Sequence, residues 1–150
     1  MSDAENTLDS LELDLLLFSV EGVSFGVDAE QVEGILSWQG GGADGLAWFH
    51  RELGYAGDTI TYRAPSVLKI RTEDARNYLV IIDMLQDVTR VVAGDIHPFP
   101  SLVEPYALHK GMWGIVVKDG RMILLVDFQR LMRERMTVDT HAEMTGDDNI

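Results

Sequence analysis

The 150-residue sequence contains no cysteine. This absence excludes disulfide bonds, thiolate-ligated zinc, iron–sulfur clusters and thiol nucleophiles. Basic residues are also few: 12 Lys and Arg stand against 25 Asp and Glu, which gives a formal net charge of −13. Binding to nucleic acid or to an anionic membrane surface depends on Lys and Arg, so neither partner is expected.

The acidic excess lies mainly at the two ends of the chain. Residues 1–14 carry five acidic side chains and no basic one, and residues 133–150 carry five acidic side chains and two arginines. We therefore expect a disordered acidic tail at 1–12, a folded domain of two lobes at 13–132 and a helical or disordered tail at 133–150. Hydrophobic residues make up 46% of the sequence, which is enough for a folded core.

Long apolar runs are absent as well. The longest are short stretches such as 15–18, 79–82 and 122–126, far below the ~18 residues of a membrane-spanning helix. The N-terminus is acidic and lacks the apolar segment of a secretory signal. The sequence predicts a soluble, cytoplasmic protein with no membrane insertion.

What the sequence does contain is a motif that occurs three times: a strand, a turn, an apolar strand, an aspartate and a short helix. The strands of the three copies are expected at 13–20, 23–27, 67–71, 78–82, 114–117 and 122–126. Helical segments are expected at 29–34, 46–53 and 128–132, and two further strands at 59–62 and 89–93. Many short strands and few helices favour an all-β barrel or a pair of barrels.

The aspartate that ends each copy has two interpretations. Asp28, Asp83 and Asp127 each follow an apolar strand. Capping explains all three at once, because an aspartate at a helix start accepts hydrogen bonds from free backbone N–H groups. The second interpretation is a small acidic enzyme in which the three carboxylates converge.

Other catalytic signals are weak. The four histidines have no metal-ligand spacing and are expected at the surface or in loops; they are His50, His97, His109 and His141. The sequence has no nucleophile elbow and no phosphate-binding loop. We therefore expect no catalytic site, no metal and no cofactor.

The repeated hairpins, in this order, resemble the CheW-like domain of bacterial chemotaxis. The segments that match the family's motifs are 16–18 with 25–35, 78–88, 95–100 and 110–131. The resemblance implies an all-β, CheW-like fold of two small SH3-like β-barrels packed together, with short helices. It also implies a non-catalytic adaptor whose partners are the regulatory domain of a CheA-type histidine kinase and the cytoplasmic tip of a chemoreceptor.

The sequence departs from the family between residues 36 and 66. The family's Asn-Leu-Arg-Gly segment is absent, and a glycine-rich loop at 40–45 stands in its place. We expect one barrel to be truncated, which leaves a strand edge for a partner or a second copy of the chain to cover. An alternative function follows: a divergent module that has lost receptor coupling and self-associates or serves another signalling pathway.

Seven residues around this departure are candidates for binding a partner. They are Val32, Ile35, Leu36, Trp38, Trp48, Phe49 and Arg51. Aromatic and arginine side chains are frequent anchors of protein interfaces. The apolar and aromatic ones would serve equally as the core of a truncated barrel, so both roles remain open for them at this point.

Overall fold

The computed structural model describes residues 10–40, 46–55, 60–74 and 76–133. Its strands are β1 (Glu12–Val20), β2 (Val23–Asp28), β3 (Val32–Ser37), β4 (Leu46–Trp48), β5 (Ser66–Ile70), β6 (Leu79–Ile82), β7 (Val88–Val92), β8 (Met112–Lys118) and β9 (Arg121–Val126). The helical segments are η1 (Ala29–Gln31), α2 (Phe49–Glu52), η2 (Ala93–Asp95), α3 (Glu104–His109) and residues 128–133.

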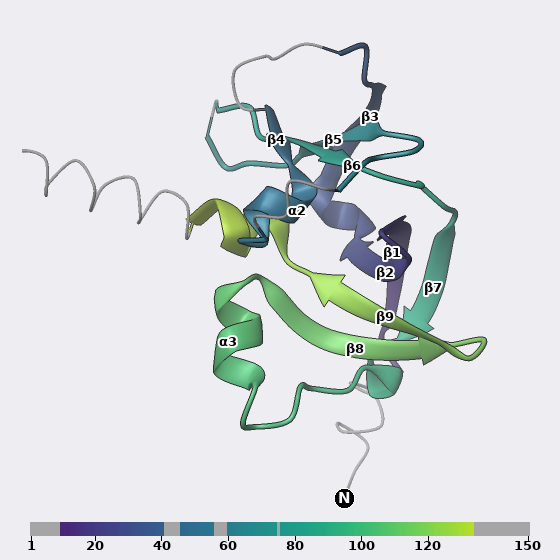
Figure 1. Cartoon of the computed structure of the whole chain (residues 1–150). Coiled ribbons are helices and arrows are strands. Elements are labelled where there is room, and N and C mark those ends of the chain that lie inside the picture. Colours follow the sequence, from purple (N-terminus) through teal and green to yellow (C-terminus); the bar gives the residue numbers. More distant parts are fainter. Residues whose placement is uncertain (1–9, 41–45, 56–59, 75, 134–150) are drawn as a thin grey trace, which may run out of the picture.

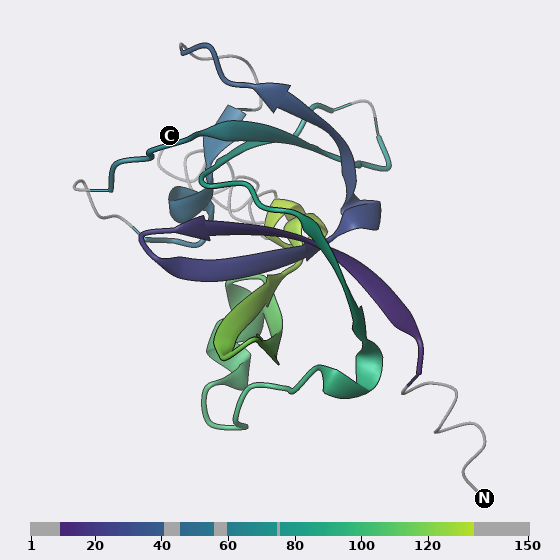
Figure 2. The same cartoon turned by 90° about the vertical axis from the view of Figure 1, so that its right-hand side faces the viewer.

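These strands form two sheets, one above the other in Figure 1. The first sheet has the order β7-β1-β2-β9-β8 and the second has the order β3-β5-β6-β4. In Figure 2 the β1–β2 hairpin, in purple and blue, lies directly beneath the strands of the second sheet. The fold is therefore mostly β, with two curled sheets and few short helices, as the sequence predicted.

The first sheet joins segments that are far apart in the sequence. β1 pairs antiparallel with β2 through a tight turn at Glu21 and Gly22, whose φ angles are 54° and 80°. Positive φ at both positions is typical of the type I′ turn that matches the twist of a hairpin. β2 then pairs in parallel with β9, with Val27 beside Val126.

The sheet curls because the chain beyond β7 returns to β8. The N–H of His97 donates to the carbonyl of Ile115, and the N–H of Ile115 donates to the carbonyl of His97, each at 2.8 Å. The Lys118 ammonium adds a hydrogen bond to the Arg90 carbonyl, at 3.3 Å, between the end of β8 and β7. The two outer strands of the first sheet are thus tied together into a barrel.

The two faces of β1 serve two different cores. Leu15 packs inside the first barrel with Val91, Val116, Ile123 and Leu125. Leu16 and Phe18 point to the other side, where they join a larger core. Strands covered on both faces read as continuous apolar runs, which explains the leucine run of β1.

The larger core contains residues of both sheets. Phe18 lies at its centre, with ring centroids 4.8 Å from Phe49, 5.6 Å from Phe25 and 6.5 Å from Phe128. The second sheet contributes Leu68, Ile70, Val80 and Ile82. We call the part of the molecule built on the first sheet the first lobe, and the part built on the second sheet the second lobe. One continuous core therefore joins the two lobes.

The second sheet has another apolar face, turned away from the larger core. Leu36, Val67, Ile81 and Trp48 lie in register across its four strands. Trp38 follows β3 and contacts Trp48 edge-on, with ring centroids 5.2 Å apart. Since β3 and β4 are the two outer strands, this contact brings the two edges of the second sheet toward each other.

Three local predictions were wrong, and one helix was not predicted. The expected helix at 29–34 is only the short turn η1, and β3 begins at Val32. The segment 46–53 begins as β4, with a helix only at α2. Residues 60–62 of the expected strand at 59–62 form no strand, and residue 59 lies outside the described residues. The helix α3 was not expected.

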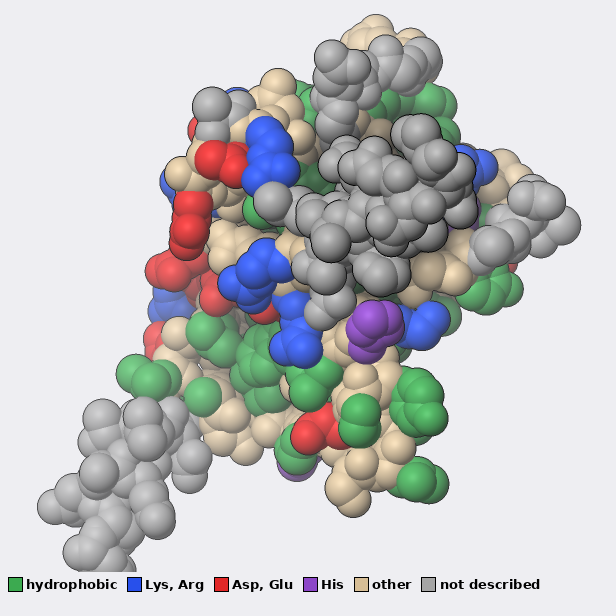
Figure 3. All heavy atoms as spheres, turned by 90° about the vertical axis from the view of Figure 1, so that its left-hand side faces the viewer, with side chains coloured by type: hydrophobic (Ala, Val, Ile, Leu, Met, Phe, Trp, Pro, Cys, Tyr) green, Lys and Arg blue, Asp and Glu red, His purple; other side chains and the backbone are tan. Residues whose placement is uncertain are grey.

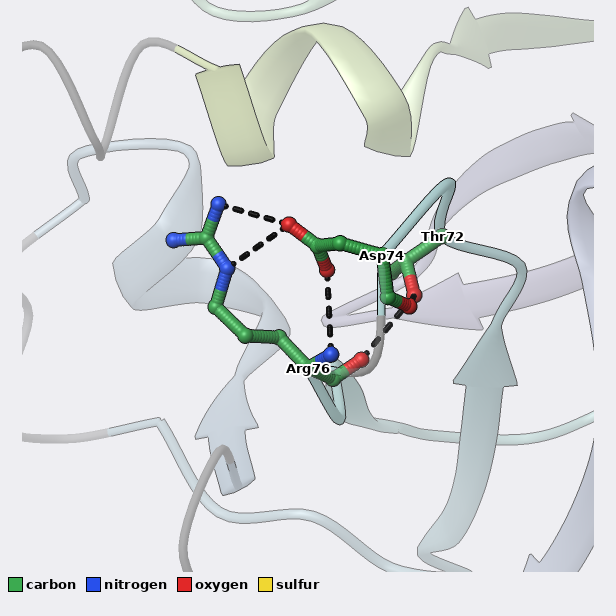
Figure 4. A network of polar contacts seen from close by, with 3 residues as sticks. All are labelled: Thr72, Asp74 and Arg76. Carbon is green, nitrogen blue, oxygen red and sulfur yellow. Dashed lines mark hydrogen bonds and ion pairs between the residues drawn. The ribbon is translucent and has the colours of Figure 1, made fainter.

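The loop between β5 and β6 is a polar turn, as predicted, and Figure 4 shows how it is held. The Arg76 guanidinium donates two hydrogen bonds to one carboxylate oxygen of Asp74, at 2.8 and 2.9 Å. The Thr72 hydroxyl lies within hydrogen-bond distance of the Asp74 and Arg76 carbonyl oxygens. The hydrogen bonds from the Arg76 side chain lower the pKa of Asp74. Because the loop is exposed, we regard it as a structural turn.

Candidate interaction surface

The outer strand β3 carries two of the predicted partner-binding residues at the surface. Ile35 is 50% exposed and Leu36 is 48% exposed. They point to opposite faces, because successive residues of a strand alternate. Val32, at the start of the same strand, is half-buried and packs against the larger core.

The aromatic residues near this strand form a connected cluster. Trp38 and Trp48 are both half-buried, and Tyr62 contacts Trp48 edge-on at 4.9 Å between ring centroids. Phe49 is only 1% exposed and lies in the larger core, so it serves as a core residue. Arg51, on α2, is exposed.

Among the described histidines, His50 departs from the expectation of an exposed position, whereas His141 lies outside the described residues. His50 is buried beside Trp48, and its Nδ1 atom lies 3.0 Å from the Tyr62 hydroxyl. Burial, helped by the charge of Arg51, lowers the pKa of His50. Burial raises the pKa of Tyr62 to about 12. Both groups are therefore neutral at pH 7, which suits a hydrogen-bonded aromatic cluster.

A second apolar surface lies on the first lobe, where the second sheet does not cover it. Its exposed residues are Val23 at the start of β2, Val117 near the end of β8 and Met122 near the start of β9. Met122 pairs directly with Val117 across the hairpin. The sequence analysis missed these residues, although their alternation with the buried Val116 and Ile123 is a readable signal.

A mainly apolar hollow of about 390 Å³ lies beside this surface. It is lined by Val20, Val23 and Phe25 of the β1–β2 hairpin, by Leu53 after α2, and by Lys110 and Met112 before and in β8. Hollows of this size accept a few side chains of a partner or a small ligand.

The third exposed apolar group lies around α3. Leu102 is 87% exposed, and Val103 and Tyr106 are exposed beside it. Figure 3 shows the face of the molecule that lies on the left of Figure 1. Hydrophobic side chains are at the surface in its lower part, where α3 lies. Lys and Arg side chains gather across the middle of the same face, and acidic ones lie along one side of it.

The aspartates that end the three strands do not form one site. Asp28 accepts a hydrogen bond from the N–H of Glu30, and Asp127 accepts one from the N–H of Arg130, so both act as caps. Asp83 is buried and accepts from the N–H groups of Arg63 and Ala64 instead. The capping prediction is therefore wrong for Asp83, because Met84 has a φ of 47° and no helix follows.

The described part of the chain offers no cluster of three or more His, Asp or Glu side chains that could hold a metal ion. Within that part, the helices are also too short or too polar to cross a membrane.

The arrangement of the two lobes defines a class of protein: a CheW-like fold of two SH3-like β-barrels. The crystal structure of the scaffolding protein TtCheW from Thermoanaerobacter tengcongensis is similar, with a TM-score of 0.61. The similarity covers 78% of this chain and 85% of that one, at 13% sequence identity. No family model and no curated protein matches the sequence. At this identity the comparison establishes the fold.

Proposed function

We propose that the chain is a non-catalytic adaptor of chemosensory signalling. It acts in the cytoplasm, without a metal or cofactor, and binds the regulatory domain of a CheA-type histidine kinase. The cytoplasmic tip of a chemoreceptor is its second partner. The observation that carries this proposal is the CheW-like fold, because the similar structure is described as a scaffolding protein.

The distribution of exposed apolar residues supports an adaptor role. An adaptor needs separate surfaces for separate partners. Ile35 and Leu36 lie on the outer strand of the second lobe, whereas Val23, Val117 and Met122 lie on the first lobe beside the hollow. We assign the kinase domain to Ile35 and Leu36, on the two faces of the outer strand β3, together with Trp38, Trp48 and Arg51. We assign the receptor to the hollow.

Calorimetric titration against the isolated kinase regulatory domain tests the first assignment. The double variant Ile35→Glu/Leu36→Glu should bind at least about tenfold more weakly, because two charges would be buried in the interface. Leu102→Glu is the matched control, since this side chain is more exposed but lies on the first lobe. Absence of binding by the native chain at high micromolar concentration would count against the kinase as partner.

The departure from the family pattern favours a second candidate function. The family's Asn-Leu-Arg-Gly segment is missing, and the described residues give the second sheet four strands with β3 unpaired on one side. A divergent module that has lost receptor coupling would retain kinase binding but fail to restore chemotaxis in a strain that lacks its standard adaptor. Restored chemotaxis would reject this candidate.

A further inference from the structure

The two sheets have four outer strands, and three of these strands are protected. β7 carries Arg90, which forms ion pairs with Glu12 and Asp14 of the adjacent strand. β8 is covered by the hydrogen-bonded pair of His97 and Ile115. β4 is only three residues long. Charged side chains, covering segments and short length are the usual ways in which proteins block strand edges.

The fourth outer strand, β3, lacks most of these protections. Its sequence from Val32 to Ser37 contains neither lysine nor proline, and its single charge is Glu33. The register with β5 shifts once, between Val32 and Gly34, and is regular from Gly34 to Ser37. Among the described residues, only β5 pairs with it. Within the described part of the chain, the outer side of β3 therefore presents backbone N–H and C=O groups with no strand partner, beside two exposed apolar side chains.

We propose that a second copy of the chain covers this edge, with the two β3 strands antiparallel about a twofold axis at Ile35. The paired sheets then form one continuous eight-stranded sheet across the dimer. Such an interface uses the same surface on both copies, so the assembly closes at two chains. The surface is also the one assigned to the kinase domain, but the self-pairing does not depend on that assignment.

The side chains of β3 fit this register. With the axis at Ile35, the two copies of Ile35 face each other, and Glu33, which lies at the register shift, comes near Ser37 of the other copy. The two glutamates therefore lie at opposite ends of the interface, and no like charges face each other directly. Gly34 faces Leu36 of the other copy, which leaves space for the leucine side chain.

The long-range charge of the two copies opposes the dimer. Each chain carries a formal net charge of −13. At 0.1 M salt, the repulsion between exposed charges more than about 10 Å apart is largely screened. The dimer should therefore become tighter as salt rises from about 0.02 M to about 0.3 M. An interface held mainly by ion pairs would respond in the opposite direction.

The absence of cysteine allows a direct test by disulfide trapping. Facing residues of antiparallel strands have Cα atoms about 4.5–5.5 Å apart, within the range that a disulfide bridges. The Ile35→Cys variant of the full chain should form a covalent dimer under mild oxidation. Met122→Cys is the control, because Met122 is 58% exposed, and thus at least as accessible, but lies on the first lobe.

Light scattering after size exclusion gives the second measurement. The native chain should shift from the mass of one chain toward that of two as its concentration rises. Ile35→Lys should raise the dimer dissociation constant at least tenfold, while Met122→Lys should leave it unchanged. Circular dichroism checks that each variant remains folded, which is expected because both positions are exposed.

Three results would overturn the self-pairing. They are a native chain that stays monomeric at several hundred micromolar, equal trapping by the two cysteine variants, and a dimer dissolved by Met122→Lys but not by Ile35→Lys. Kinase binding is measured separately, below the concentration at which dimers form. A monomer that still binds the kinase domain would reject the dimer and leave the adaptor function intact.

Discussion

At the scale of the single residue, Gly111 shows how closely the last helix packs against the start of β8. Its φ is +75°, and a Cβ atom built there would lie 2.6 Å from Leu131 Cγ and 3.2 Å from the Asp127 carbonyl oxygen. Leu131 is buried in the larger core. The site therefore excludes a side chain for two reasons, its backbone conformation and its lack of space.

Gly111→Ala should lower the free energy of unfolding by about 3 kcal/mol, since it adds a steric overlap to the strain of a positive φ. Gly120→Ala is the matched control: its φ is +74°, but a Cβ atom there would meet nothing within 4 Å. The control should cost only about 1 kcal/mol. Urea denaturation measures both, and equal losses would mean that packing at Leu131 adds nothing.

His50 and Tyr62 make stability fall at opposite ends of the pH range. The folded state lowers the pKa of His50 below its ordinary value of 6.5. The stability from keeping His50 neutral is therefore present above pH 6.5 and is lost as the pH falls further. The folded state raises the pKa of Tyr62 from 10.0 to about 12. That contribution is present below pH 10 and is lost between about pH 10 and 12.

At the scale of the element, Gln31 joins two segments that are almost a hundred residues apart. Its side-chain amide donates to an Asp127 carboxylate oxygen at 3.0 Å and accepts from the Phe128 N–H, also at 3.0 Å. Asp127 also accepts from the Arg130 N–H. The turn η1 and the start of the last helix thus share one hydrogen-bonded group.

A double-mutant cycle tests whether this group acts as a unit. Gln31→Ala and Asp127→Ala should each cost about 2 kcal/mol, because each removes two hydrogen bonds of a half-buried network. The double variant should cost about 1 kcal/mol less than the sum, since both changes remove the same bond. Gln31→Ala combined with Asp74→Ala, in the exposed β5–β6 loop, should be additive. Additivity in both pairs would contradict the coupling.

The sequence predicted strands well where the signal is local, as an apolar run or an alternation followed by a turn. β1, β2, β5, β6, β7, β8 and β9 all lie within about one or two residues of their expected ranges. β3 was missed because Val32, Ile35 and Leu36 have helical spacing, and its strand conformation depends on pairing with β5, some 30 residues away. β4 depends in the same way on β6.

The exposure of the candidate residues could be predicted only in part. Among the apolar candidates near the departure from the family pattern, Ile35 and Leu36 are exposed. Phe49 has the same character but lies in the core, because α2 places it against Phe18 and Phe25. Composition cannot separate an exposed apolar residue from a buried one, since the tertiary packing decides. Their roles in binding remain predictions.

At the scale of the whole molecule, the two lobes should unfold together. The larger core takes Leu16, Phe18 and Phe25 from the first sheet and Leu68, Val80 and Ile82 from the second. Separating the lobes would expose these side chains on both sheets. A shared core of this kind makes independent unfolding of either lobe unfavourable.

The positions of the tryptophans allow this to be measured. Trp38 and Trp48 report on the second lobe, and Trp113, in β8, reports on the first. In Trp113→Phe and in Trp38→Phe/Trp48→Phe, the fluorescence midpoint in urea should coincide with the circular dichroism midpoint of the same variant. Comparison within each variant removes the effect of the substitution on stability. Separate midpoints would show that the lobes unfold independently.

The parallel pairing of β2 with β9 also sets the order in which the protein can form during synthesis. Because Val27 pairs with Val126, β2 gains its second neighbouring strand only after β9 has been synthesised. The second sheet lies within residues 32–82, yet its core needs Phe128 from the late part of the chain. Neither lobe is complete until about residue 128 has left the ribosome. Since so many contacts are distant in sequence, folding is expected in the millisecond-to-second range, after most of the chain has been made.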